Sequence, residues 1–370
     1  MRALVIGGSG SSGVPLVTGL LERGHEVAVL HRGVHEPAEL PEVEHLHADP
    51  HFAETLTEAV GAREFDVVLA MYGRVATIAE VFAGRCGQLV SIGAVPAYRG
   101  CLEPEKVRPY GMALWAREDG PLADAAEYVP KFAALIRGAE RAVLDRAAQG
   151  VYRGSVVRYP AIYGPRNLVP WEWSVIRRVL DGRSRMILPD NGLWIISRCA
   201  ARNAAEVVLK VVDNAEVANG QVYNATDDDQ FTVRQWAEAI AGILGAELEF
   251  VGVPAELVPS ALIELLPPTG QPHITLDNSK AKLELGYRQV VPAAAALVEA
   301  VEWLKANPVT REDYPLYPGR FDYAAEDRLL DTYAQAVAWV RQHSPDEAPD
   351  VRHPMPHPKT AVVGRDESGR

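Results

Sequence analysis

The stretch that decides the fold opens the chain: Arg2-Ala-Leu-Val-Ile6, then Gly7-Gly-Ser-Gly10-Ser-Ser-Gly13, then Val14-Pro-Leu-Val-Thr-Gly-Leu-Leu-Glu-Arg23. An apolar run leads into glycines spaced three residues apart and then into a pattern of helical period. Glycines permit a tight turn and close approach of the backbone to phosphates, and the free N–H groups of the new helix bind negative charge. This order predicts a cradle for the pyrophosphate of a dinucleotide. Its expected contacts are Gly7, Gly10, Gly13 and the backbone of Ser11 and Ser12.

Composition limits the classes of protein to which the chain can belong. Its 370 residues are 48% hydrophobic and carry 37 basic and 49 acidic side chains, for a net charge of -12. No basic block could neutralise a phosphate backbone, so we expect no nucleic-acid partner. Three cysteines far apart form neither a disulfide framework nor a metal site, which favours a reducing compartment. The chain enters its first strand at once and has no apolar run of spanning length, so we expect a cytoplasmic protein without a membrane partner.

The end of the second predicted strand bears on the choice of cofactor. Residues 25–30 form this strand, and His31-Arg32 follows where NAD-specific folds usually carry an acidic residue for the ribose 2′-OH. Arg32 suits a 2′-phosphate, so NADP is preferred over NAD, although an Arg after a strand is also an ordinary surface residue. Asp49, after the third strand at 43–47, is expected to accept from the adenine amino group, to cap the helix at 52–60, or both.

Two further apolar runs, at 65–70 and 88–92, are typical of strands buried in a parallel sheet. Ligands bind outside the carboxyl ends of such strands, so the residues that follow them are expected near the reactive end of the cofactor. A polar, proline-bearing segment at 99–128 is predicted to be a surface loop or lid, and a helix follows from Pro130 to about Gln149. The residues expected near the cofactor from these two strands are Ala70, Met71, Tyr72, Ser91, Gly93 and Tyr98.

A sixth strand at 154–160 completes a set of ordered motifs. They are the G-x-x-G-x-x-G turn, R-x-x-x-x-Y-G-P at Arg158 to Pro165, Asn224 closing a later strand, and Leu276-Asp-Asn-Ser-Lys280 leading to Leu285-Gly-Tyr287. With these motifs the sequence resembles the extended branch of the short-chain dehydrogenase/reductase superfamily, the NAD-dependent epimerase/dehydratase type, over about residues 1–307. The resemblance implies an α/β fold: a Rossmann-type, doubly wound parallel sheet that binds NAD(P), with a smaller C-terminal lobe over a small-molecule substrate. It also implies that Tyr159 and Pro160 lie at the nicotinamide.

The sequence departs from this family where the chemistry is expected. The superfamily uses a Ser or Thr after the fifth strand and a Tyr-x-x-x-Lys pair on the next helix, with the Tyr as acid/base at the substrate oxygen. Alignment on Glu140 puts Phe132 and Ile136 at the pair, and a shift of one residue gives Lys131 and Leu135. The Ser position falls on Gly93. The remaining catalytic candidates are Tyr98, Tyr72 and Lys131, although a Tyr at a strand end is more often a pocket wall.

The segment after the Y-G-P motif is where extended members contact substrate. Arg166, Trp171, Trp173 and Arg177 are therefore expected to contact it, and two tryptophans suit a flat or aromatic molecule. The alternative is that the tryptophans pack into the core of the lobe. Helical periodicity predicts the helices of this lobe at 171–180, 203–212, 233–244 and 292–304.

We expect four segments along the chain. They are a Rossmann domain at 1–165 with sheet contributions from later segments, a substrate-binding lobe at 166–310, an extension with a helix at 311–343, and a disordered, proline-rich tail at 344–370. The helix of the extension, at 324–342, is expected to dock on the body or to form a subunit contact, as in a homodimer. Prolines around His353 and His357 argue against a metal site there.

These observations lead to three hypotheses for function. The first is an NAD(P)-dependent oxidoreductase that acts on a secondary alcohol or ketone of a small, flat or aromatic molecule through a non-standard active site. The second is an isomerase, epimerase or lyase that recycles a tightly bound NAD(P). The third is a non-catalytic NADP(H)-binding or sensing protein. The substrate, the group that replaces the Tyr-Lys pair and the oligomeric state stay open at this point.

Overall fold

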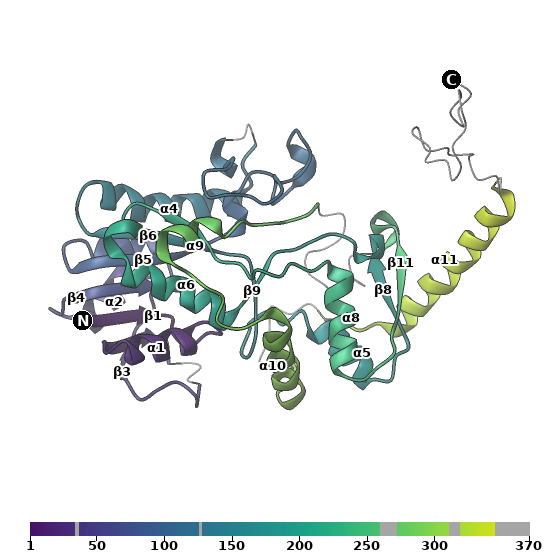
Figure 1. The fold of residues 1–370 in the computed structure, drawn as a ribbon, viewed down its shortest axis with the longest axis horizontal. Helices are drawn as coiled ribbons and strands as arrows, with labels where there is room; N and C mark the ends of the chain where they lie inside the picture. Colours follow the sequence, from purple (N-terminus) through teal and green to yellow (C-terminus); the bar gives the residue numbers. More distant parts are fainter. Residues whose placement is uncertain (34–36, 126–127, 260–271, 311–318, 345–370) are drawn as a thin grey trace, which may run out of the picture. The chain divides into compact units, whose positions relative to one another are not determined.

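The computed structural model describes residues 1–33, 37–125, 128–259, 272–310 and 319–344 (Figure 1). The chain forms two compact units, Met1–Asp322 and Tyr323–Arg370. The second contains helix α11 (Tyr323–His343), which confirms the helix predicted at 324–342. The tail predicted to be disordered, including its two histidines, lies outside the described residues beyond position 344.

The first unit is built on a parallel sheet that orders the predicted strands as a doubly wound fold. In the described residues the seven strands follow the order β10-β6-β5-β4-β1-β2-β3. The chain runs from β1 outward to β2 and β3, and then returns to β4 on the other side of β1. The topological switch therefore lies between β1 and β4, where such folds bind ligands. The strands are β1 (Arg2–Ile6), β2 (Glu26–His31), β3 (Glu44–His47), β4 (Phe65–Ala70), β5 (Cys86–Ala94), β6 (Arg153–Tyr159) and β10 (Val222–Asn224).

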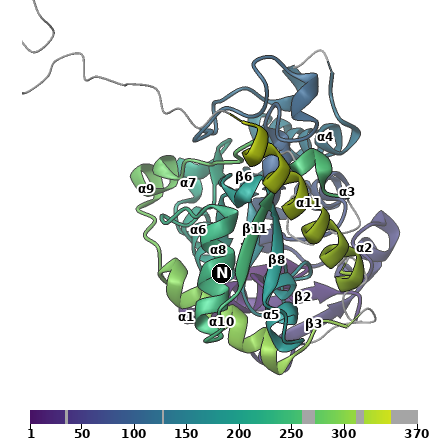
Figure 2. The same ribbon diagram turned by 90° about the vertical axis from the view of Figure 1, so that its right-hand side faces the viewer.

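Helices cover both faces of this sheet (Figures 1 and 2). One face packs α1 (Gly13–Glu22), α6 (Ala201–Asp213) and α9 (Ser279–Leu285), and the other packs α2 (Ala53–Val60), α3 (Val75–Val81) and α4 (Lys131–Ala148). Apolar strand residues pack against the helices on both faces, which is why the sequences of these strands are continuous hydrophobic runs.

One helix lies in a different layer from the one the sequence suggested. The periodic stretch at 203–212 was expected in the substrate lobe, but α6 packs on the sheet against α1. A Cβ on Gly19 of α1 would lie 2.4 Å from a methyl carbon of Leu209, so the two helices meet with almost no space between them. Periodicity shows that a helix has an apolar face but not which surface that face covers.

The smaller lobe holds two short strand pairs and a helical core rich in tryptophan. Trp173, Trp194 and Trp236 are each at most 7% exposed and share one apolar cluster. Trp173 therefore packs into the core of the lobe, which was the alternative to contact with substrate. The pairs are β7 (Ala161–Tyr163) with β9 (Arg198–Ala200) and β8 (Arg185–Pro189) with β11 (Glu249–Val253). The helices are α5 (Trp173–Leu180), α8 (Val233–Ile243) and α10 (Ala293–Ala306), and the short α7 (Ala215–Ala218) follows α6.

The segment at 99–128 is attached to the later chain rather than being a free surface loop. The Ala116 N–H donates to the Thr275 carbonyl at 2.8 Å, and the Asp277 N–H donates to the Ala116 carbonyl at 3.0 Å. Tyr98, Met112 and Ala116 share a buried cluster with Ile274 and Leu276. The expectation of a surface loop is thus wrong for this part, because Met112 and Ala116 are buried and the Trp115 N–H donates to the Thr275 hydroxyl, 160 positions further along the chain.

No helix in the described ranges combines the length and the apolar character that crossing a bilayer requires. Within the same residues, no group of three or more His, Cys, Asp or Glu side chains is placed to hold a metal ion.

Candidate cofactor and active site

The glycine turn after β1 has the close packing that a phosphate cradle requires. Gly7 has φ +86°, and a Cβ there would lie 2.4 Å from Cβ of Tyr72 after β4. A Cβ on Gly13, at the start of α1, would lie 2.1 Å from the Gly8 carbonyl oxygen. Gly10, between them, has no atom within 4 Å of such a Cβ and leaves its surface open. The turn thus seals its inner side and keeps an outer side free for a ligand.

The start of α1 adds the electrostatics of an anion site. Helix α1 has no acidic residue in its first turn, and no side chain caps its N-terminus. Gly13 donates its N–H to the Gly10 carbonyl at 2.9 Å and Pro15 has no N–H, so this end offers the N–H groups of Ser12 and Val14, together with the helix dipole, to a negative group. The residues present fit the pyrophosphate of NAD(P).

A second group of side chains gathers beside this turn, at the carboxyl ends of β2, β3 and β4. The Arg32 guanidinium carbon lies 5.6 Å from the centroid of the Tyr72 ring, and the His51 ring meets Tyr72 edge-on at 5.2 Å. Asp49 accepts from the His51 backbone N–H at 3.0 Å and lies 2.7 Å from His51 Nδ1. Hydrogen bonds from His51 lower the pKa of the Asp49 carboxyl. Arg32 and Asp49 are thus brought together with His51 and Tyr72.

Two of these placements differ from the sequence interpretation. Asp49 does not cap α2, whose N-cap is Phe52 with no side-chain hydrogen bond, because the Asp49 carboxylate is engaged by His51. Tyr72 was a catalytic candidate for the reactive end, but its neighbours are Arg32 and His51, which follow β2 and β3. His51 was missed altogether, and its only signal was a polar aromatic residue just past a strand end.

His31 occupies the place of the ribose-binding acid. It is 5% exposed, its Nδ1 accepts from the Gly33 N–H at 3.0 Å, and its Nε2 lies 2.8 Å from Nδ1 of His45. The Gly33 bond makes Nδ1 the acceptor, so Nε2 carries the hydrogen. Because this residue is a histidine and not an acid, a 2′-phosphate would meet no carboxylate side chain at position 31.

The other residues predicted to bind the cofactor lie beneath the site. Ala70 and Ser91 are at most 1% exposed, and Met71 is half-buried beside the same core as Tyr159. Burial raises the pKa of Tyr159, whose side chain hydrogen-bonds Ser12 below the glycine turn. The Tyr159 ring therefore supports the cradle from within, while Pro160 keeps part of its surface exposed.

The other two catalytic candidates, Tyr98 and Lys131, have very different environments. Tyr98 is 1% exposed, its hydroxyl donates to Asn224 Oδ1 at 2.7 Å, and burial raises its pKa to about 12. Lys131 is exposed at the first position of α4. Phe132, at the aligned tyrosine position, is 55% exposed, and Ile136 lies one turn later. The helix thus presents apolar side chains where the family carries its acid/base pair.

The aligned serine position is also unable to carry a hydroxyl without rearrangement. A Cβ on Gly93 would lie 2.8 Å from Oε1 of Glu140 and 3.3 Å from Cγ of Arg158. Arg158 donates to both oxygens of Glu140, at 2.8 and 2.9 Å, and Arg137 donates to the same carboxylate. This buried ion cluster occupies the space beside Gly93.

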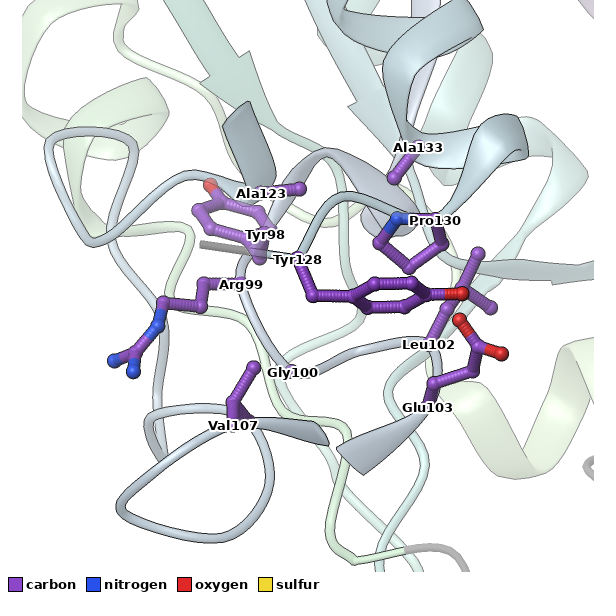
Figure 3. A pocket seen from close by; sticks show the side chains of 10 residues that line it. All are labelled: Tyr98, Arg99, Gly100, Leu102, Glu103, Val107, Ala123, Tyr128, Pro130 and Ala133. Atoms are coloured by element: carbon purple, nitrogen blue, oxygen red, sulfur yellow. The ribbon is translucent and has the colours of Figure 1, made fainter. Parts of the chain in front are cut away.

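A small cavity lies between the segment at 99–107 and the start of α4 (Figure 3). Its volume is about 10 Å³, room for a single water molecule. The Tyr128 ring forms one wall with its hydroxyl directed at Glu103, whose hydrogen bond raises the pKa of Tyr128. The Tyr128 hydroxyl is thus hydrogen-bonded to Glu103, and the cavity is too small for a substrate.

The four expected substrate residues do not form one surface. Trp173 is 2% exposed in the lobe core, and Arg177 pairs with Asp181 at 2.7 Å on its own helix. Trp171 is half-buried. Arg166, at φ +63°, forms an ion pair with Glu39 from the segment between β2 and β3.

The residues around Arg166 contact the glycine turn. The Ser11 hydroxyl donates to the Pro165 carbonyl at 2.8 Å, and Gly164 lies next to the same hydroxyl. We call this contact, together with the Arg166–Glu39 ion pair, the turn clasp. It places the Y-G-P segment on the phosphate cradle.

The fold and these motifs define a class of protein. The fold is the one that solved structures of a sugar-nucleotide epimerase and a dehydratase share, and the glycine turn and R-x-x-x-x-Y-G-P segment are those by which the sequence resembles the extended short-chain dehydrogenases/reductases. The sequence departs from that resemblance at α4, where neither alignment supplies the Tyr-x-x-x-Lys pair. No protein-family model matches the chain.

Proteins similar to this chain include one relative in sequence and two solved structures. The chain is 29% identical over 314 residues to a 3-diazoavenalumate denitrifying reductase from a Streptomyces species, covering 79% of this chain and 97% of the relative. A UDP-glucose 4-epimerase structure from Thermotoga maritima has a TM-score of 0.65 at 18% identity and covers 83% of this chain and 99% of its own. A dTDP-glucose 4,6-dehydratase from Streptomyces venezuelae, with NAD bound, has a TM-score of 0.62 at 21% identity, covering 83% and 98%.

Proposed function

We propose that the chain is an NADP(H)-dependent reductase that transfers a hydride to a diazo-type electrophile on a small aromatic molecule, with loss of nitrogen. The observation that carries the proposal is an open phosphate cradle on the same sheet edge as an active-site helix without an acid. The similarity to a denitrifying reductase of a diazo compound supports it.

Different residues would bind the pyrophosphate, the 2′-phosphate and the adenine of the cofactor. The turn from Gly7 to Gly13 and the start of α1 would hold the pyrophosphate, Arg32 the 2′-phosphate and Asp49 the adenine amino group. A bound NADPH would supply the hydride. His31 supports the choice of NADP over NAD, because it replaces the acid that would accept from a free ribose hydroxyl.

The missing acid/base pair favours a reaction that needs no proton from the protein. Reduction of a ketone creates an alkoxide, which a positioned acid must protonate. Reduction of an aryl diazonium group does not, because the hydride and its two electrons form the new C–H bond while the C–N bond breaks and N2 leaves. Phe132 and Ile136 suit this step, since an apolar wall keeps water from competing for the electrophile.

The test compares two substrates of matched shape. The full chain is incubated with 4-deuterated NADPH and either 4-diazobenzoate or 4-acetylbenzoate, with heat-denatured protein as the control for the uncatalysed reaction. We expect protein-dependent formation of benzoate that carries deuterium at the former C–N position, and no reduction of the ketone. Reduction of the ketone alone would refute the diazo assignment and restore the alcohol or ketone reading.

A second candidate is an isomerase, epimerase or lyase with a recycled cofactor. The turn clasp favours it, because contacts that tie the Y-G-P segment to one side of the glycine turn would slow the release of a bound nucleotide. Freshly purified protein is denatured, and any released dinucleotide is identified by chromatography and absorbance with its oxidation state. Nucleotide that appears only on unfolding would favour this candidate. Reversible binding of NADPH without turnover of either substrate would favour a non-catalytic binder.

A further inference from the structure

We propose that Tyr72 is a specificity-determining positioning residue, whose ring holds the Arg32 guanidinium in place for the 2′-phosphate of NADP. The inference rests on the proposed NADP(H) site and adds a residue to it. Tyr72 follows β4 at the topological switch, and its Cβ lies against the first glycine of the turn.

The route of the Arg32 side chain is the first argument. Arg32 follows β2 and Tyr72 follows β4, and β1 lies between these two strands in the sheet. The guanidinium carbon nevertheless lies 5.6 Å from the Tyr72 ring centroid. The exposed Arg32 side chain therefore reaches across the end of β1, and its guanidinium lies on the side of the glycine turn.

The support of the Tyr72 ring is the second argument. Gly7 limits the position of its Cβ, and His51 packs edge-on against the ring with an interplanar angle of 85°. His51 is in turn held by Asp49 through its backbone N–H and its Nδ1. The ring remains 43% exposed, so it is fixed at its base and on one side while another part faces the site.

These contacts have a consequence for selectivity. A long Arg side chain loses rotamer freedom when it binds a ligand, and a cation held over an aromatic ring has lost part of that freedom beforehand. The benefit applies only to a ligand that uses the guanidinium, which is the 2′-phosphate in our assignment. Loss of the Tyr72 ring should therefore weaken ligands with a 2′-phosphate and spare those without one.

The experiment uses two fragments of the cofactor, so that no turnover is needed. Binding of 2′,5′-ADP and of 5′-AMP to the full chain is measured by calorimetry for the wild type, Tyr72→Leu, Tyr72→Phe, Arg32→Leu and the double variant with leucine at both positions. We expect Tyr72→Leu to weaken 2′,5′-ADP by about threefold to fivefold, the size of an exposed cation–π contact, and to leave 5′-AMP unchanged. Tyr72→Phe retains the ring and should bind like the wild type.

The double variant separates positioning from direct contact. If Tyr72 acts through Arg32, then Tyr72→Leu causes no further loss once Arg32 is leucine. Equal weakening of both fragments, or fully additive losses, would overturn the inference and make Tyr72 a wall for the adenine. A wild-type chain that binds neither 2′,5′-ADP nor NADPH would instead refute the proposed function, and this inference with it.

Discussion

The buried carboxylate of Glu140 offers a direct test of what holds the active-site edge of the sheet together. The Glu140 carboxylate on α4 accepts two hydrogen bonds from Arg158 of β6 and a third from Arg137. The side chains of Glu140 and Arg158 are each 1% exposed, and that of Arg137 is 11% exposed. The perturbation is Glu140→Gln, which keeps the shape and removes the charge.

The size of the effect follows from the burial of the cluster. A glutamine has one acceptor oxygen for the three donors, and its amide hydrogens would face guanidinium groups that also donate. Arg137 keeps its ion pair with Asp124 at 3.1 Å, but the Arg158 guanidinium, 1% exposed, loses its carboxylate partner. Removing one partner of a buried ion pair destabilises proteins by about 3 to 5 kcal/mol, so we expect a loss of about that size in the free energy of unfolding.

Urea denaturation followed by far-UV circular dichroism measures this loss. The matched control is Glu302→Gln, because Glu302 pairs with Lys305 on the exposed face of α10 and its side chain is 54% exposed. We expect the control to change the free energy of unfolding by less than about 0.5 kcal/mol. If Glu140→Gln costs less than about 1 kcal/mol with an unchanged slope, the cluster is not the support that its geometry implies.

Four shorter predictions concern the cofactor site and the buried titratable groups. Arg32→Glu should weaken NADP binding more than NAD binding, and equal losses in a fluorescence titration would remove the 2′-phosphate assignment. Glu39→Gln should speed the release of bound nucleotide by about twofold to fivefold, the value of an exposed ion pair, and unchanged stopped-flow release would mean that the turn clasp does not retain the cofactor. Because the pKa of Tyr98 is raised to about 12, the native state holds this proton more tightly than the unfolded chain; stability should fall from pH 10 to 12, less steeply in Tyr98→Phe, and identical slopes would refute it. The buried thiols of Cys86 and Cys101, whose pKa values burial raises to about 12, should react with a thiol reagent at pH 8 only after unfolding, and fast labelling of native protein would contradict their burial.

The elements nearest the glycine turn are predictable from sequence because their signals are local. Strand β1, the turn and α1 follow from one apolar run, three glycines and one helical period, and the same reasoning places α4 after Pro130. The fold class follows from the alternation of such segments, since parallel strands buried on both faces must be joined by helices. The absence of the Tyr-x-x-x-Lys pair is likewise visible in the sequence alone.

The residues that meet across the sheet edge could not be predicted in this way. Tyr72 is a catalytic candidate in sequence because it follows a strand, and only the strand order shows that β1 separates it from Arg32, whose guanidinium lies 5.6 Å from its ring centroid. His51 carries no motif, and its role follows from the ring that it touches. Arg166 was expected at the substrate, but its partner is Glu39, 127 positions away.

The doubly wound fold and the glycine turn could be predicted from local sequence, because strand, turn and helix signals depend on neighbours a few residues apart. The face of the sheet that α6 covers, the burial of Tyr98, and the grouping of Arg32, His51 and Tyr72 depend on long-range contacts and are visible only in the folded chain. The physical reason is that packing and long-range pairing are properties of surfaces that the fold brings together, and residue type states only what each side chain could contribute to them.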